Sequence, residues 1–322
     1  MKKLIALVLA AMMLLGLTAC GEAGQAGEQS KDKFVVGVCQ LVPHEALDAA
    51  TKGFVDALKE ELGDQVEIIE KVGGGDMATC TPIINDFVAK DVDLIMANAT
   101  PALQAAAAAT EDIPILGTSV TEYGVALELE GFNGTVGGNI SGTSDLAPLD
   151  QQAAMVTEWF PEAKNVGLLY CSAEANSIYQ VETVKADLEG KGLKCTLYPF
   201  SDTNDLTAIA QKAADESDVI YIPTDNQAAS AAETIDGVCR AAGKPVIAGE
   251  EGICKGCGVA TLSISYYDLG VTTGKMAAKI LKGEADISTM PIAYAENFTK
   301  KYNPEICEAL KLTALEGYVA IG

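Results

Sequence analysis

The stretch FVVGVCQLVPHEALDAATKGFVDALKEELGDQVEIIEKV, residues 34–72, decides the fold class of this chain. Its two ends, residues 34–40 and 66–72, are short apolar runs rich in β-branched residues, which is typical of strands. Between them, apolar residues recur every three or four positions and predict an amphipathic helix over 44–62. The stripe consists of Leu47, Ala50, Phe54, Leu58 and Leu62. This order predicts two parallel strands joined by a helical crossover.

The same alternation continues after residue 72 and completes a first lobe. Strands are expected at 93–98 and 113–118, with helices over 79–90 and 101–109. A glycine-rich stretch, GTVGGNISGTSD at 134–145, then interrupts the pattern.

The pattern restarts after this stretch and predicts a second lobe. Its expected strands are 165–171, 194–200, 218–223, 245–249 and 259–264. Helices are expected between them, the clearest over 226–242, and a last long helix begins after Tyr266. The sequence therefore predicts an α/β protein with two doubly wound parallel sheets, joined by a hinge.

Residues 1–19 have the pattern of a secretory signal. Lys2 and Lys3 precede an uncharged apolar run, and small residues lead up to Cys20. A cysteine at this place predicts a lipoprotein, cleaved before Cys20 and carrying diacylglycerol on its thiol, outside the cytoplasmic membrane. An ordinary secretory signal ending near a cysteine is the alternative. The small polar residues of 20–33 predict a flexible tether.

The composition restricts the chemistry. The 322 residues carry a net charge of −23, which disfavours nucleic acid as a partner. A single histidine, His44, excludes a histidine-rich metal site and leaves one candidate base for a nucleophile. We expect His44 to line a cleft at a helix start. The run VGGGD at 72–76 lacks the spacing of a nucleotide-binding loop and predicts a tight turn. We expect no cofactor and no metal.

The cysteines after Cys20 are scattered. Cys39, Cys171 and Cys195 lie in apolar runs that favour buried free thiols. Cys254 and Cys257 are predicted to form a local loop disulfide, or to remain two free thiols in a surface hairpin.

Polar residues follow the predicted strands, where doubly wound sheets bind ligands. The candidate ligand-binding residues are Gln40, Thr100, Pro101, Thr118, Ser119, Glu174, Asn176, Ser177, Thr224, Asp225, Asn226 and Glu250. Thr100 ahead of Pro101 has the form of a helix N-cap, whose free amides would suit a carboxylate. Asp225 or Glu250 could hold an ammonium group, so that two closing lobes would clamp a zwitterion. Helix capping without a ligand is the alternative for Thr100 and Asp225.

Several segments resemble the solute-binding lipoproteins of ABC importers of the tryptophan/tyrosine-binding type. They are HEALDAATKGFVDAL (44–58), NATPALQAAAAATEDIPILGTSVTE (98–122), SAEANS (172–177), YIPTDN (221–226), AGEEG (248–252) and YYDLGVTTGKMAAKILKGEA (266–285). The resemblance implies a type I periplasmic-binding-protein fold, in which the chain crosses between the lobes three times. It also implies that Thr100, Ser119, Asn176, Ser177, Asp225 and Glu250 line the cleft. Cys39, Cys80 and the loop between Cys254 and Cys257 depart from the family pattern.

The resemblance and the predicted strands together give expected domain boundaries. Lobe 1 would comprise 34–139 and 266–290, and lobe 2 would comprise 140–265 and 291–322. Hinge crossings are expected at 137–141, at 262–265 and near Pro291.

The resemblance implies a monomeric binding protein, not an enzyme, that delivers a free amino acid, aromatic in several members, to a permease. The Cys20 lipid would attach it to the bilayer. A ligand sensor for a membrane receptor and a binder of another small polar solute are alternatives. An extracellular hydrolase gains little support, because no GxSxG motif surrounds a serine.

Overall fold

The computed structural model describes residues 33–322, and the signal, Cys20 and nearly all of the tether lie outside the described residues. Six strands form a first sheet in the order β11-β5-β4-β3-β1-β2, and all its pairs are parallel. They are β1 (Phe34–Gln40), β2 (Val66–Val72), β3 (Leu94–Asn98), β4 (Ile115–Val120), β5 (Ile140–Ser144) and β11 (Ala293–Tyr294).

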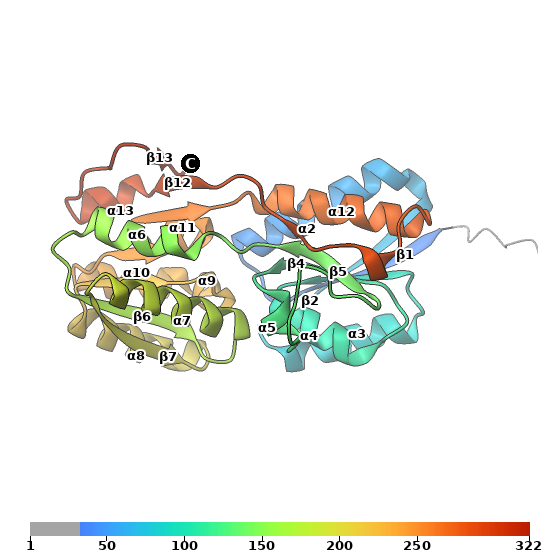
Figure 1. The fold of residues 1–322 in the computed structure, drawn as a ribbon, viewed down its shortest axis with the longest axis horizontal. Coiled ribbons are helices and arrows are strands. Elements are labelled where there is room, and N and C mark those ends of the chain that lie inside the picture. The colour runs from blue at the N-terminus through green and yellow to red at the C-terminus, as the bar shows by residue number, and fades with distance from the viewer. Residues whose placement is uncertain (1–32) are drawn as a thin grey trace, which may run out of the picture. The chain divides into compact units, whose positions relative to one another are not determined.

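Helices cover both faces of this sheet (Figure 1). One face carries α2 (Glu45–Leu62) and α12 (Tyr266–Leu281), which lie side by side. The other carries α3 (Met77–Ala89), α4 (Thr100–Ala109) and the short α5 (Tyr123–Ala126). The predicted strands 34–40 and 66–72 are confirmed, and the helix expected over 44–62 begins one residue later.

Seven strands form a second sheet in the order β13-β12-β10-β9-β8-β6-β7. They are β6 (Asn165–Cys171), β7 (Lys194–Phe200), β8 (Val219–Ile222), β9 (Val246–Ala248), β10 (Ala260–Ser263), β12 (Thr299–Tyr302) and β13 (Val319–Ala320). Only β10 and β12 pair antiparallel within it. The chain therefore has the two expected doubly wound sheets, with an irregular edge added by its C-terminal segment.

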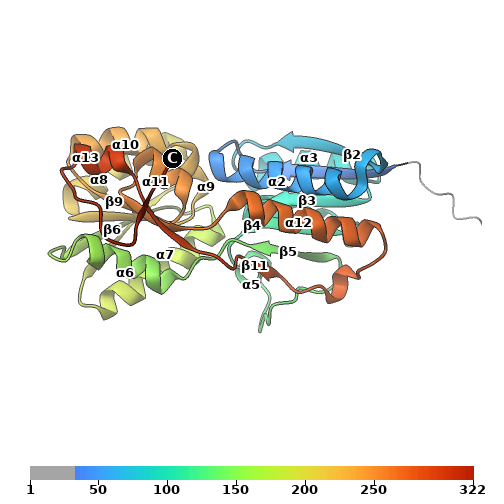
Figure 2. The same cartoon turned by 90° about the horizontal axis from the view of Figure 1, so that it is seen from above.

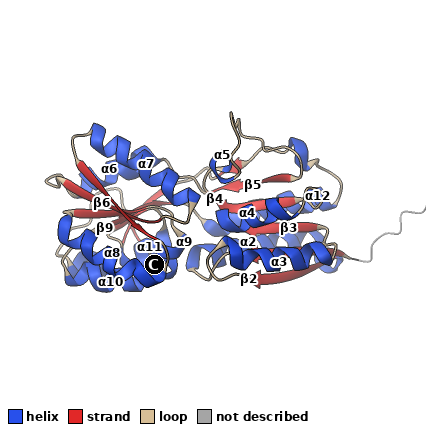
Figure 3. Ribbon diagram, turned by 90° about the horizontal axis from the view of Figure 1, so that it is seen from below, coloured by secondary structure: helices blue, strands red, loops and turns tan. Residues whose placement is uncertain are grey.

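Helices again cover both faces of the second sheet (Figure 3). One face carries α6 (Leu149–Trp159) and α7 (Ala175–Gly190), and the apolar core beneath them includes Ile306 of α13 (Pro304–Ala309). The other carries α8 (Thr203–Glu216), α10 (Ala232–Ala241) and α11 (Glu251–Cys257). The helix expected over 226–242 is divided at Ala231 into α9 (Asn226–Ser230) and α10.

The chain crosses between the two sheets three times (Figure 2). The crossings are 145–148, 264–265 and 295–298, because β5 and β11 belong to the first sheet while β12 belongs to the second. The second crossing agrees with the prediction. The first falls after Ser144 and not at 137–141, and the third falls beyond Tyr294 and not near Pro291. Lobe 1 therefore extends to 144 and to 294.

The cysteines differ in two respects from the prediction. Cys195 was expected to be buried and is only half-buried. Cys254 and Cys257 lie in α11 and are buried, so the surface hairpin is wrong. Every cysteine in residues 33–322 is a free thiol, and Cys39 and Cys171 are buried as expected. None of the helices in this part of the chain has the length and hydropathy needed to cross a membrane.

Candidate functional site

Residues from both lobes and from the first crossing enclose a small buried cavity, which we call the central cavity. Its volume is ≈10 Å³, room for about one water. It is lined by His44, Leu47, Ser119, Thr121, Asp145, Asn176, Thr224, Asp225, Asn226, Ala229, Glu250 and Tyr266. Three of these residues carry carboxyl groups and none is a lysine or arginine. Such a lining favours a cationic group.

The polar atoms of the lining are incompletely paired. His44 Nδ1, Ser119 Oγ, Asp145 Oδ1 and Asn176 Oδ1 are buried and have no hydrogen-bond partner. An unpaired buried polar atom costs about 1–3 kcal/mol, so most such atoms in folded proteins are paired. Four unpaired atoms around one cavity therefore indicate a place built to contact something other than the protein.

The His44 ring joins the two lobes. His44 precedes α2 in lobe 1, and its Nε2 lies 3.2 Å from Oδ1 of Asn226 in lobe 2. Asn226 Nδ2 donates to Glu174 at 2.5 Å, which fixes the orientation of the Asn226 amide. Burial lowers the His44 pKa, while the bond to Asn226 and the charge of Asp48 oppose this shift.

Asp145 belongs to the first crossing and is 3% exposed. Its Oδ2 accepts a hydrogen bond from the Tyr266 hydroxyl at 2.9 Å, which ties the first crossing to the residue that follows the second. Burial raises the pKa of Asp145, and the hydroxyls of Tyr266 and Thr121 lower it. Only the Tyr266 hydroxyl has hydrogen-bond geometry, which leaves Oδ1 unpaired.

Asp225 and Glu250 line the cavity, but their oxygens are already used. Asp225 accepts from the backbone amides of Cys171 at 2.6 Å and of Ala228 at 2.8 Å. Glu250 accepts from the amides of Gly252 and Ile253. Both residues are therefore N-caps, of α9 and α11. For Asp225 this is the capping alternative given above, and for Glu250 a capping role was not among the expectations.

Lobe 1 contributes strained backbone beside the cavity. Ser119 has φ +54° and Ala99 has φ +94°, both in the left-handed region that residues other than glycine rarely occupy. Ala99 is the N-cap of α4, so Thr100 is the first helical residue and not the cap that we expected. The Thr100 hydroxyl is buried and unpaired.

The structure brings six of the twelve predicted site residues to the cavity: Ser119, Asn176, Thr224, Asp225, Asn226 and Glu250. The other six are buried behind this lining or within lobe 1: Gln40, Thr100, Pro101, Thr118, Glu174 and Ser177. Gln40 bonds to Asp48 and Thr51, and Thr118 bonds to Thr143. Glu174 accepts from the amides of Asn226 and Gln227. These bonds assign positioning roles to Gln40, Thr118 and Glu174.

Sequence reasoning missed other lining residues. Leu47, Thr121, Asp145, Ala229 and Tyr266 were not among the candidates. Asp145 could have been found as the residue that follows a strand. However, β5 has the sequence ISGTS, whose small residues do not form an apolar run, so we assigned this stretch to the hinge.

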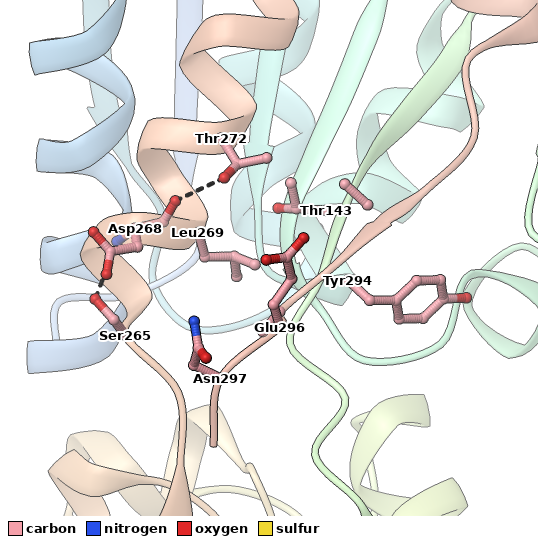
Figure 4. Close-up of a pocket in the computed structure, with 10 residues that line it drawn as sticks. Thr143, Ser265, Asp268, Leu269, Thr272, Tyr294, Glu296 and Asn297 are labelled. Atoms are coloured by element: carbon pink, nitrogen blue, oxygen red, sulfur yellow. Dashed lines mark hydrogen bonds between the residues drawn. The ribbon is translucent and has the colours of Figure 1, made fainter. Parts of the chain in front are cut away.

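A larger cavity of ≈340 Å³ lies near the hinge, between the start of α12 and residues 293–297 (Figure 4). The polar groups of α12 that line it are paired within the helix: Ser265 caps the amide of Asp268, and Thr272 bonds to the Asp268 carbonyl. No residue lining it has an unpaired buried polar atom. It therefore lacks the feature that distinguishes the central cavity.

The buried carboxyl groups make the stability of the free protein depend on pH. Burial raises the pKa of Glu174 to about 8 and that of Glu250 to about 7. The unfolded chain has a glutamate pKa of about 4.3, so the folded state binds more protons between these values. The stabilisation is therefore present at low pH and is lost as the pH rises through the folded pKa values.

We expect the free energy of unfolding to rise by up to a few kcal/mol as the pH falls from about 8 to about 6. At lower pH, protonation of His44 favours the unfolded state and opposes this rise, because burial lowers the His44 pKa in the folded state. Denaturant titrations across this range measure the effect, and Glu174→Gln should reduce the slope. An equal slope in this variant would contradict the assignment to Glu174.

The fold and the site define a class of protein: two parallel sheets joined by three crossings, with a buried polar site between their carboxyl ends, form a two-lobed ligand-binding protein. Comparison with known proteins agrees. Residues 35–320 match the family of ABC transporter substrate binding proteins, and this chain belongs to that family. It is a family of binding proteins and not of enzymes, whose members serve importers from outside the cytoplasm.

Individual relatives are similar over nearly the whole chain. The tyrosine-binding protein of Clostridioides difficile is 31% identical over 98% of this chain and 94% of its own. A domain from Streptococcus pneumonia in complex with L-Trp is 33% identical, with a TM-score of 0.85 over 90% of this chain and all of its own.

A third relative differs in conformation. The ligand-free, open structure of a substrate-binding protein with adhesive properties from Clostridium difficile is 34% identical, with a TM-score of 0.67 over 89% of this chain and 99% of its own.

Proposed function

We propose that this protein captures a free amino acid with an aromatic side chain in the central cavity and delivers it to the permease of an ABC importer. The observation that carries the proposal is the set of four unpaired polar atoms from two lobes around one buried cavity. Names of relatives support the ligand class, since one binds tyrosine and another was solved with L-Trp.

Capture requires the lobes to move apart. A cavity of ≈10 Å³ cannot admit an amino acid. Three contacts join the two lobes: His44 with Asn226, Gln227 with the Gly75 carbonyl, and Lys255 with Glu45. The higher TM-score to the L-Trp complex than to the open structure supports the closed state for this conformation. Ligand binding then shifts the population toward a closed form, which alone touches the ligand from both sides.

An aromatic side chain would find apolar surface next to the central cavity. A neighbouring cavity of ≈230 Å³ shares Glu250 and Tyr266 with it, and Ala46, Ala49 and Ile264 line its apolar part. Burying an aromatic side chain removes about 150–250 Å² from water, a gross gain of roughly 4–6 kcal/mol. This gain offsets the cost of closing the hinge, and small amino acids gain less.

The ligand carboxylate would lie toward lobe 1. Ser119 places an unpaired hydroxyl at the cavity, and α4 begins nearby at Thr100 without a capping side chain. Free amides at a helix start favour an anion. The sites for the two charges of a zwitterion would then be separate.

We propose that Cys20 carries the lipid that holds the protein at the outer face of the cytoplasmic membrane, as a monomer. A sensor that presents the closed form to a membrane receptor would use the same site. A hydrolase gains no support, because His44 pairs with Asn226 and no hydroxyl or thiol in residues 33–322 hydrogen-bonds to its ring.

The test is a ligand titration. Calorimetry of protein that has been unfolded and refolded to remove retained ligand should show tighter binding of Trp, Tyr or Phe than of Leu or Ala, by at least about tenfold. Small-angle scattering should show compaction with the same ligands. Tighter binding of Leu or Ala than of all three aromatics would contradict the ligand class, and binding without compaction would contradict closure.

A further inference from the structure

Of the four unpaired atoms at the central cavity, the Ser119 hydroxyl can both donate and accept, and the other three are acceptors. Each of these three comes from a different part of the two-lobed structure. His44 Nδ1 belongs to lobe 1, Asp145 Oδ1 to the first crossing and Asn176 Oδ1 to lobe 2. All three residues line the same ≈10 Å³ space.

The bond to Asn226 determines that His44 Nδ1 is an acceptor. Asn226 directs its Nδ2 to Glu174, so its Oδ1 faces His44 and can only accept. His44 Nε2 must therefore carry the proton of that bond. In a neutral imidazole the other nitrogen then has a free lone pair. Burial favours this neutral form by lowering the His44 pKa.

The Asn176 amide is oriented by its neighbours in the same way. Its Nδ2 lies 3.2 Å from Glu174 Oε2 and 3.1 Å from the Thr224 carbonyl. A reversed amide would place oxygen against these two acceptors. Asn176 Oδ1 therefore points away from them and remains an acceptor without a partner.

Asp145 is the only carboxyl group of the lining with an unpaired buried oxygen, since both oxygens of Asp225 and of Glu250 accept backbone amides. An ammonium group has three N–H donors and one positive charge. Besides the Ser119 hydroxyl, the cavity offers three unpaired acceptors, one of them a carboxylate oxygen.

We propose that His44 Nδ1, Asp145 Oδ1 and Asn176 Oδ1 together bind the primary ammonium group of the ligand. This inference rests on the proposed amino-acid function and names the residues that determine specificity for the amine. Because the acceptors come from lobe 1, lobe 2 and a crossing, the ammonium group meets all three only when the lobes are closed. The amine thereby favours closure.

The first experiment compares ligands that differ in the amine. L-Trp and L-Tyr are titrated into the wild-type protein together with their deaminated analogues, 3-(indol-3-yl)propionate and 3-(4-hydroxyphenyl)propionate. The wild type should bind the amino acid at least about 100-fold more tightly than its analogue, because deamination leaves three buried acceptors unpaired. Asp145→Asn should weaken the amino acid about 10- to 100-fold and change the analogue little.

The control is Asp150→Asn, an exposed carboxylate five residues along the chain, which should leave both affinities unchanged. Melting curves establish that each variant is folded. Equal affinity of the wild type for an amino acid and its deaminated analogue would overturn the proposal. Unchanged amino-acid affinity in folded Asp145→Asn would overturn it too, and both results would leave the proposed function standing.

The second experiment needs no variant. Because the chain has one histidine, its ¹⁵N-labelled imidazole gives a single pair of ring signals, both from His44. Adding L-Trp or L-Tyr should shift the Nδ1 signal in the direction of an accepted hydrogen bond while Nε2 remains protonated. A bound amino acid that leaves Nδ1 unshifted would overturn the role of His44. Absence of binding by any amino acid would defeat the proposed function itself, and with it this inference.

Discussion

Replacing Gly270 by alanine should destabilise the protein by about 3 kcal/mol or more. Gly270 lies in α12 where this helix contacts α2, and a Cβ there would overlap the carbonyl oxygen of Ala50. Gly53 of α2 meets the backbone of Tyr267 in the same way. Overpacking a core costs about 1–3 kcal/mol when side chains can adjust, and a clash with backbone leaves less room for adjustment.

The matched control is Gly237→Ala. Gly237 is also a helical glycine, in the exposed part of α10, but a Cβ there would meet nothing within 4 Å. Because alanine is a better helix former, this variant should be neutral or more stable by up to about 1 kcal/mol. Thermal and denaturant unfolding measure both changes. Equal stability of the two variants would show that α2 and α12 are not packed this closely.

Replacing Cys20 by serine should abolish attachment of the lipid. A serine hydroxyl cannot replace the thiol that would carry diacylglycerol. Acyl chains contribute about 0.8 kcal/mol per buried CH₂, so their loss should move the protein from the membrane to the soluble fraction, or leave an uncleaved precursor.

Metabolic labelling with a fatty acid and cell fractionation measure this result. The control is Cys195→Ser, since Cys195 is a half-buried thiol in β7 without small residues leading up to it. It should keep the label. Labelled lipid on the Cys20→Ser protein would contradict the signal that we infer from residues 1–20.

The strands and helices with strong periodicity were predictable to within about two residues. Runs such as 34–40 and 165–171 form inner strands that are mostly buried, each with a neighbouring strand on both sides, so they are largely apolar and easy to recognise. β5 was not predictable in this way, since Ile140 is its only large apolar residue. Because β5 was not predicted, the expected lobe boundary was placed at 139 and not at 144, and Asp145 was not among the candidate site residues.

The candidate site was half predictable. Residues after strands do gather at one place, because parallel strands end at the same edge of a sheet, and six of the twelve candidates line the cavity. Their roles were not predictable. A carboxylate after a strand can cap the next helix or face a ligand. The local sequence around Asp225 or Glu250 does not distinguish these two roles.

By itself, the sequence determined the fold class and the family pattern, since hydrophobic periodicity and short motifs are local properties of the chain. Only the tertiary structure decided which polar atoms remain unpaired. Hydrogen bonds between residues far apart in sequence, such as Cys171 with Asp225 and Asn226 with His44, use some acceptors and leave others free. Which acceptors are paired depends on distances across the sheets and between the lobes, and no local sequence pattern encodes these distances. Only the tertiary structure therefore identifies the unpaired acceptors of His44, Asp145 and Asn176.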